Sequence, residues 1–287
     1  MTDVRTVLTG KSARWLYSAA GVVCCIAFTE LWSETYLYAS SLAFVFTICG
    51  FLHAIVFRDC KWTDPPERVD TLDRPDWREH GAAFARAVTS GAMFVAVVWA
   101  LLMQLGDDSF HSGGWYLFYI AIFAPFVAFT RKRTENVNFK ATLVTVLVMD
   151  LILSSYEYLL LSRGTGWAYE GTIIGHIFDV PVENILFIYP VAGALVCVLY
   201  SIVTRYHNDF KAFWLLMGGL TCVFVPVELV GIGWLHLWDV DRFSRLSILP
   251  FWHTNIEEFV YYLLFQALAA LFYIWFEQNL ARPPEPA

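Results

Sequence analysis

The sequence predicts an all-α membrane protein, a polytopic transmembrane helix bundle of about eight spans. Its 287 residues are 58% hydrophobic and 17% aromatic but only 16% charged, which is far more apolar than a soluble domain. Apolar runs of roughly 20 residues, enough to cross ~30 Å of hydrocarbon, recur along the chain. The formal net charge of -7, without any basic patch, argues against a nucleic-acid partner.

The candidate spans divide the chain into two regions of four spans each. Residues 1–135 form an N-terminal transmembrane region, and residues 136–287 form a second region with a weak internal repeat. No small-residue cleavage site follows the first apolar run, so we interpret it as a span and not as a signal peptide. The expected bounds are approximately 13–32, 36–57, 82–105, 114–130, 139–162, 178–204, 211–235 and 251–276.

The distribution of Lys and Arg gives the expected orientation. With alternating spans, 15 of the 19 basic residues fall on one side of the membrane, three fall on the other, and Arg86 lies within the third span. Positive charge is retained on the cytoplasmic side of membrane proteins. We therefore expect a multi-pass integral membrane protein, embedded in the lipid bilayer with both termini in the cytoplasm.

Carboxylates inside the spans are the strongest candidates for function. Acidic residues are costly in the membrane, so they usually face a protein interior and mark a functional site. The expected topology puts four of them at similar depth, in the outer third of the bilayer. The candidate catalytic residues are Asp150, Glu157, Glu183, Glu228, Glu257 and Glu258.

Two of these acids share a helix, and one neighbouring acid has a simpler explanation. Asp150 and Glu157 are seven residues apart, which predicts one helix face and a separation of about 10 Å. Asp179 stands at the start of the sixth span, where a carboxylate is favourable as a helix cap. We therefore expect Asp179 to cap that helix and to have no catalytic role.

Aromatic side chains surround the acids in the sequence. Many Trp and Tyr residues near span ends are interface anchors. Ring faces also stabilise a passing positive charge, so an acid within an aromatic wall is suited to carbocation chemistry. The candidate substrate-binding residues are Trp167, Tyr169, Phe187, Trp238, Trp252 and Tyr261.

The second region contains two similar segments. Glu157 and Glu228 are 71 residues apart, as are Trp167 and Trp238, whereas Glu183 and Glu257 are 74 apart. The second copy would therefore carry a three-residue insertion. Repeats that meet at a shared central site are common in polytopic proteins.

The first copy contains two short motifs that characterise a known family. These are Trp167-Ala168-Tyr169 and Pro181-Val182-Glu183-Asn184. They resemble the Trp-x-Tyr loop and the Pro-x-Glu-Glu/Asp motif of the integral-membrane lycopene cyclase domain of bacterial heterodimeric and fungal fused carotenoid cyclases. Asn184 stands where that family has a second acid. The resemblance covers roughly residues 140–280.

The resemblance implies a membrane-embedded, redox-neutral cyclase that acts on a lipid-soluble isoprenoid or carotenoid end group. It implies that Glu183 and Glu257 are the acid and the base, in an order that the sequence leaves open. An apolar pocket favours a neutral carboxyl group that can donate a proton, and a nearby ionised carboxylate can stabilise the cation and accept a proton. No nucleotide, flavin, metal or other cofactor is expected, since no GxGxxG or zinc spacing occurs.

The same carboxylates also fit another class of protein. Intramembrane Asp and Glu residues serve as proton relays, so a proton-coupled membrane transporter or channel is the alternative. A retinal-type photoreceptor is disfavoured, because none of the last three spans has a Lys within its apolar core.

Overall fold

In a computed structural model of the protein, residues 37–58, 123–124, 126–130, 136–162, 168–169, 175–233, 238–239, 250–251 and 254–280 are described. These residues are mostly helical. Three of their helices are long and apolar enough to cross a membrane: Phe139–Ser162, Asn184–Thr204 and Phe259–Leu280. A shorter apolar helix spans Ala43–Val56.

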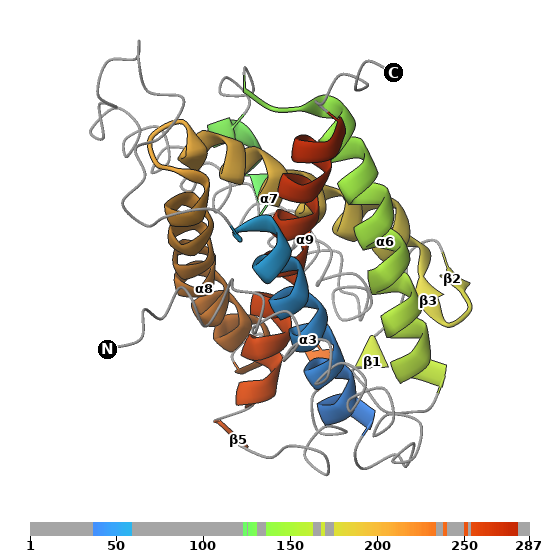
Figure 1. Ribbon diagram of the computed structural model, residues 1–287. Coiled ribbons are helices and arrows are strands. Elements are labelled where there is room, and N and C mark those ends of the chain that lie inside the picture. The colour runs from blue at the N-terminus through green and yellow to red at the C-terminus, as the bar shows by residue number, and fades with distance from the viewer. Residues whose placement is uncertain are drawn as a thin grey trace.

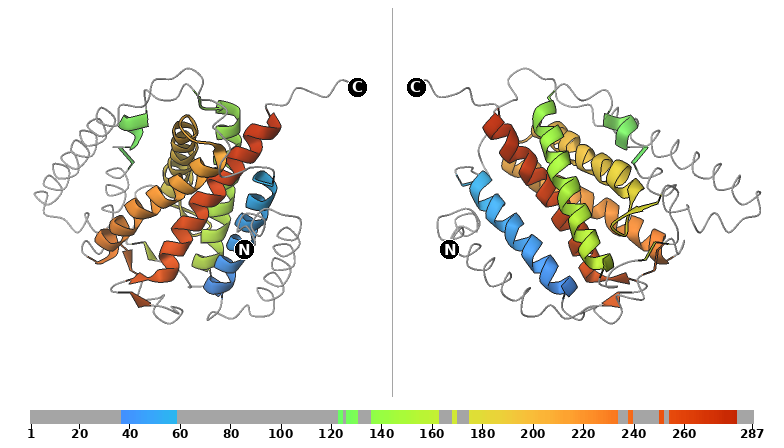
Figure 2. Two further views of the ribbon diagram at one scale, coloured as in Figure 1. Left: turned by 60° about the vertical axis from the view of Figure 1, so that its left-hand side comes forward. Right: turned by 90° about the vertical axis from the view of Figure 1, so that its right-hand side faces the viewer.

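The described helices form a bundle around one central helix, α9 (Figure 1). Helix α9 packs on α3, α6, α7 and α8. Figure 2 shows α3 on one side of α9 and α7 on the other. The elements are α3 (Leu37–Val56), α6 (Phe139–Ser162), β1 (Ala168–Tyr169), β2 (His176–Ile177), β3 (Val180–Pro181), the π-helix η1 (Asn184–Ile188), α7 (Tyr189–Thr204), α8 (Asp209–Gly233), β4 (Trp238–Asp239), β5 (Pro250–Phe251), β6 (Thr254–Asn255) and α9 (Ile256–Leu280).

Helix α6 has a buried face and an opposite apolar face. Residues at spacings of three or four, among them Met149, Leu153 and Leu160, are buried in the core. Leu143, Leu147 and Leu151, each four residues apart, are 48%, 59% and 69% exposed. A soluble helix would place polar residues on that second face. An apolar outer face is what a helix in contact with lipid requires.

Side-chain caps begin two of the helices. The side-chain oxygen of Asn138 accepts the backbone N–H of Ala141 at 3.1 Å, before the start of α6. Asn208 accepts the backbone N–H of Lys211 at 2.8 Å, at the start of α8. Each cap satisfies one of the N–H groups that a helix leaves without an internal partner.

Short antiparallel strands gather toward one end of the bundle, where α6 ends and α9 begins (Figure 1). Strands β2 and β3 form a hairpin, and so do β5 and β6. Strand β1 pairs with β4, which joins the loop after α6 to the loop after α8. These strands shorten two predicted spans, because residues 178–181 and 251–255 had been assigned to helices.

The turn of the first hairpin corrects the prediction for Asp179. Phe178 and Asp179 both have positive φ, 50° and 64°, as a two-residue hairpin turn requires. Asp179 is exposed in this turn, and helical backbone begins only at Val182. The expected capping role of Asp179 is therefore wrong, because the chain folds back on itself before the helix starts.

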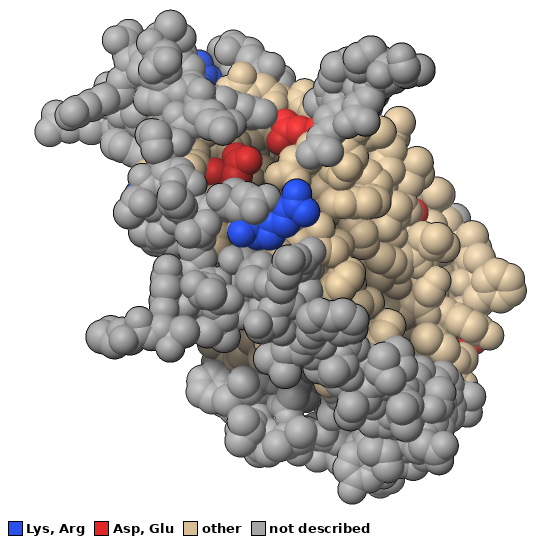
Figure 3. All heavy atoms as spheres, viewed as in Figure 1, with Lys and Arg blue, Asp and Glu red and all other residues tan. Residues whose placement is uncertain are grey.

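Charged side chains are sparse on the described surface. In the face shown in Figure 3, that surface is mostly uncharged, and its acidic and basic residues gather mainly toward the end where α9 finishes. Exposed aromatic and aliphatic side chains include Phe46, Leu151 and Leu186. A large exposed apolar surface is unfavourable in water and favourable in lipid.

A tyrosine in the core joins three helices near the beginning of α6. The hydroxyl oxygen of Tyr273, whose side chain is fully buried in α9, accepts the backbone N–H of Asn138 at 3.1 Å. The same hydroxyl lies 2.8 Å from Oγ of Ser201 in α7. Tyr273 therefore connects α6, α7 and α9 through polar contacts inside an apolar core.

Replacing Tyr273 by Phe is expected to lower the free energy of unfolding by about 1–3 kcal/mol, because a buried N–H group and a buried hydroxyl lose their partner. The measurement is unfolding of the purified protein in mild detergent. Tyr158→Phe is the control: its ring is 42% exposed, and a change within about 0.5 kcal/mol is expected. Equal stability of the two variants would contradict the role given to Tyr273.

Candidate functional site

The most deeply buried acid among the described residues is Glu157, whose side chain is fully inaccessible. It lies in the last two turns of α6. The side-chain amide of Asn184 donates to both carboxylate oxygens, at 3.1 and 3.2 Å. The hydroxyl of Tyr189 donates to Oε2 of the same carboxylate. A buried carboxylate is expensive unless it is hydrogen-bonded, and these donors offset that cost.

The π-helix η1 brings the two donors together. Asn184 and Tyr189 are five residues apart, and the backbone N–H of Tyr189 donates to the carbonyl of Asn184, as one π turn requires. In a regular α-helix, side chains five positions apart would diverge by about 140°. The wider turn therefore directs both side chains toward Glu157.

The proline that follows favours this wide turn. Pro190 lacks a backbone N–H, and in a regular α-helix its ring would clash with the carbonyl group four residues earlier, that of Leu186. Opening the helix by one residue per turn relieves such a clash. π-Turns inserted in helices occur frequently at functional sites.

A second acid, Glu183, directly precedes η1 and is only 7% exposed. It occupies the N-cap position of η1, but its side chain makes no capping hydrogen bond. Capping therefore does not account for a carboxylate at this buried position. Glu183 and Asn184 are consecutive, so Glu157 and Glu183 lie close together in the fold.

Aromatic rings lie beside this group on α6 and α9. Tyr156, the neighbour of Glu157 in sequence, stacks on Tyr261 with centroids 5.5 Å apart. Phe265 lies 5.2 Å from Tyr156 and 4.5 Å from Tyr261. These three rings are buried. The expected aromatic surroundings of the acids are thus present for Tyr261.

The other predicted substrate-binding residues have different positions. Phe187 is 38% exposed and makes an edge contact with Phe123 at 6.5 Å. Tyr169 in β1 is paired with Trp238 in β4, although only their backbones are described. Trp167 and Trp252 lie outside the described residues.

The remaining predicted acids are only partly described. Asp150 is half-buried, and Ser154 donates a hydrogen bond to it at 3.4 Å. Glu228 lies in α8, and Glu257 and Glu258 lie in the first turn of α9, but their side chains fall outside the description. The predicted convergence of Glu183, Glu228 and Glu257 on one cavity therefore stays a prediction.

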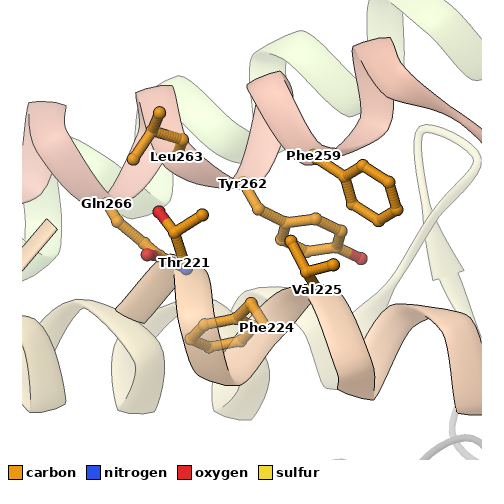
Figure 4. Close-up of a pocket in the computed structure, with 7 residues that line it drawn as sticks. All are labelled: Thr221, Phe224, Val225, Phe259, Tyr262, Leu263 and Gln266. Carbon is orange, nitrogen blue, oxygen red and sulfur yellow. The ribbon is translucent and has the colours of Figure 1, made fainter. Parts of the chain in front are cut away.

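A hollow between α8 and α9 is the other notable feature of this region. Figure 4 shows that the rings of Phe224, Tyr262 and Phe259 line it together with polar side chains of both helices. Phe224 and Tyr262 are stacked, with centroids 5.9 Å apart. The hollow has room for about one water molecule, so it is too small for a hydrocarbon end group.

Two members of the site were not predicted to be functional. Asn184 attracted attention only as the non-acidic position of a motif, and Tyr189 was not singled out. The sequence does contain a usable signal, since Asn184 and Tyr189 flank a segment that ends in Pro190. A proline inside a long apolar helix indicates a local change of helical geometry.

The arrangement combines a fixed carboxylate, two donors that hold it, a second buried acid and nearby aromatic rings. Such a group can stabilise a positive charge and exchange a proton away from bulk water. Comparison of the whole chain with protein-family models, curated proteins and solved structures gives no match.

Proposed function

We propose that this protein is a multi-pass membrane enzyme that cyclises the end group of a lipid-soluble isoprenoid or carotenoid, in the manner of the lycopene cyclases. The observation that carries the proposal is the buried carboxylate of Glu157, held by Asn184 and Tyr189 next to the buried Glu183. The motif resemblance in the same segment supplies the substrate class. Cyclisation of this kind needs acid and base groups in a dry, aromatic pocket.

The reaction is redox-neutral. A carboxylic acid gives its proton to the terminal double bond, and the resulting cation is attacked by an internal double bond, which forms the ring. A second C–H bond then breaks, and its proton goes to a carboxylate, so one proton enters and one leaves. We assign these exchanges to Glu183 and Glu257.

The supporting roles follow from burial and position. Glu157 is fixed by its donors, so its negative charge is suited to stabilising the cation as it forms. Asp150, Glu228 and Glu258 are proposed as further acids of the same site. Tyr261 and its ring neighbours would form part of the aromatic wall.

The test is to express the chain in a host that accumulates lycopene and to analyse the extracted pigments. A new cyclic carotenoid, absent from the host with an empty vector, is the expected result. An unchanged pigment profile at good expression would contradict the proposal. Uptake of protons by vesicles containing the purified protein would then favour the proton-coupled transporter.

We also propose that the complete chain crosses the membrane about eight times with both termini in the cytoplasm. Reporter fusions at Thr63 and Glu135 are then expected to report a cytoplasmic location, and fusions at Ser112 and Thr172 the opposite side. The measurement is the activity of paired reporters, each active on one side only. A reversal at any of the four positions would disprove this topology and the shared depth of the acids.

A further inference from the structure

The described part of the second region contains the same order of elements twice. Helix α6 is followed by β1, the β2–β3 hairpin and the helix formed by η1 and α7; helix α8 is followed by β4, the β5–β6 hairpin and α9. We call these stretches the first and second units, residues 138–204 and 208–280. Within each unit, the first helix packs on the last helix and on the second strand of the hairpin.

The two units also begin alike. Phe139-Lys140-Ala141 and Phe210-Lys211-Ala212 have the same sequence, 71 residues apart, and each follows an Asn that caps its helix. This is the spacing that separates Glu157 from Glu228. The match therefore runs from the cap to the acid, through most of the first helix of each unit.

The hairpins match at the second spacing. In the first unit His176 pairs with Pro181 and Ile177 with Val180. In the second unit the same pairs occur 74 residues later, Pro250 with Asn255 and Phe251 with Thr254. The spacing of 74 also separates Glu183 from Glu257, and it places Glu258 at the position of Asn184.

The units meet through their own equivalent strands. Strand β1 pairs antiparallel with β4, with Ala168 opposite Asp239, and these two residues are again 71 apart. A contact in which each unit uses the same segment is what a local two-fold axis produces. The acids of the two units then flank this axis at the same end of the bundle.

We infer that the two units are equivalent halves with divided roles: the first unit accepts the proton that leaves the substrate, and the second unit supplies the proton that enters. This inference rests on the proposed cyclisation and decides between Glu183 and Glu257. The deciding feature is the position held by Asn184 in one unit and by Glu258 in the other. Glu183 is the acceptor, and Glu257, with Glu228 and Glu258, belongs to the donor.

The amide explains why the first unit accepts. Asn184 can only donate through its NH₂ group, and it donates to both oxygens of Glu157. Hydrogen bonds to a carboxylate favour its charged form. A fixed negative charge in the first unit stabilises the cation, which is the species that must lose a proton.

The carboxylate at the matching position explains why the second unit supplies. With Glu258 in place of an amide, three acids stand at the positions that hold two acids and a donor in the first unit. Like charges close together in an apolar region do not all ionise, so such a group retains a proton. That O–H bond breaks as the terminal carbon of the substrate is protonated, and the proton lost from the ring passes to Glu183.

The roles can be separated by deuterium exchange in membranes suspended in D₂O with an acyclic carotenoid. Glu183→Gln should lose cyclic product on the order of tenfold or more, while the recovered acyclic substrate still gains deuterium, because protonation and its reversal need only the donor. Glu257→Gln should lose both product and exchange. The opposite pattern, or loss of exchange in both variants at normal membrane content, would overturn the division of roles.

A readout that does not depend on activity completes the test. The infrared carbonyl band of a neutral carboxylic acid should be present in the parent protein and weaker in Glu258→Asn, but unchanged in the matched variant Glu157→Gln. Equal bands in Glu258→Asn and the parent would overturn the inference even if the enzyme cyclises its substrate. If the parent yields no cyclic product, the proposed function fails, and the infrared comparison still decides whether the second unit holds the proton.

Discussion

Glu157→Gln is expected to reduce the yield of cyclic product by roughly 10²–10³-fold, the usual scale for removing one preorganised electrostatic group. Glutamine has nearly the same volume and can still accept the hydroxyl proton of Tyr189, so packing should be retained. It cannot carry the negative charge that Asn184 and Tyr189 hold in place. The measurement is pigment analysis in a lycopene-accumulating host at equal amounts of protein in the membrane.

The matched control is Asp179→Asn, another acid-to-amide change nearby in the sequence. Asp179 is exposed in the hairpin turn with φ 64°, a conformation that Asn adopts readily. Its variant should give the parental yield. If Glu157→Gln also gave the parental yield, the buried carboxylate would have no part in the chemistry.

Asn184→Leu is expected to lower the free energy of unfolding by about 1.5–3 kcal/mol, the range for hydrogen bonds to a charged group. Leucine is similar in size, so the loss comes from the carboxylate of Glu157, which would remain buried with one of its donors removed. Unfolding of the purified protein in mild detergent provides the measurement.

Asn279→Leu controls for the change from amide to hydrocarbon. Asn279 is exposed near the end of α9, where its amide donates only to the carbonyl of Trp275 in the same helix, at 2.7 Å. This control should change stability by no more than about 0.5 kcal/mol. Similar losses in both variants would mean that the contact of Asn184 with Glu157 does not stabilise the fold.

Hydropathy predicts helices well where nothing but a helix is apolar. The span expected at residues 139–162 coincides with α6, because a polar segment and the cap Asn138 precede it. The starts of the sixth and eighth spans were placed too early, since the strands β3 and β5 are themselves apolar. Hydropathy counts apolar residues and does not distinguish a short strand from the first turn of a helix.

The site was predictable in its acids and not in its geometry. Glu157 and Glu183 could be identified because a carboxylate within an apolar span needs a protein environment. Their partners depend on a π turn, which changes the direction of Asn184 relative to Tyr189 without changing the composition of the segment. Periodicity arguments assume the α-helical angle between successive residues, so they assign these two side chains to different faces.

The π turn makes the site sensitive to the length of one short segment as well as to its residues. A deletion of one residue between Asn184 and Tyr189 would allow a regular i→i+4 turn in place of the i→i+5 turn. Every residue on the N-terminal side, Glu183 included, would then rotate by about 100° relative to α7. Such a deletion would leave each functional side chain in the sequence and still separate them in space, whereas most substitutions among the exposed residues of the turn, such as Leu186, would not.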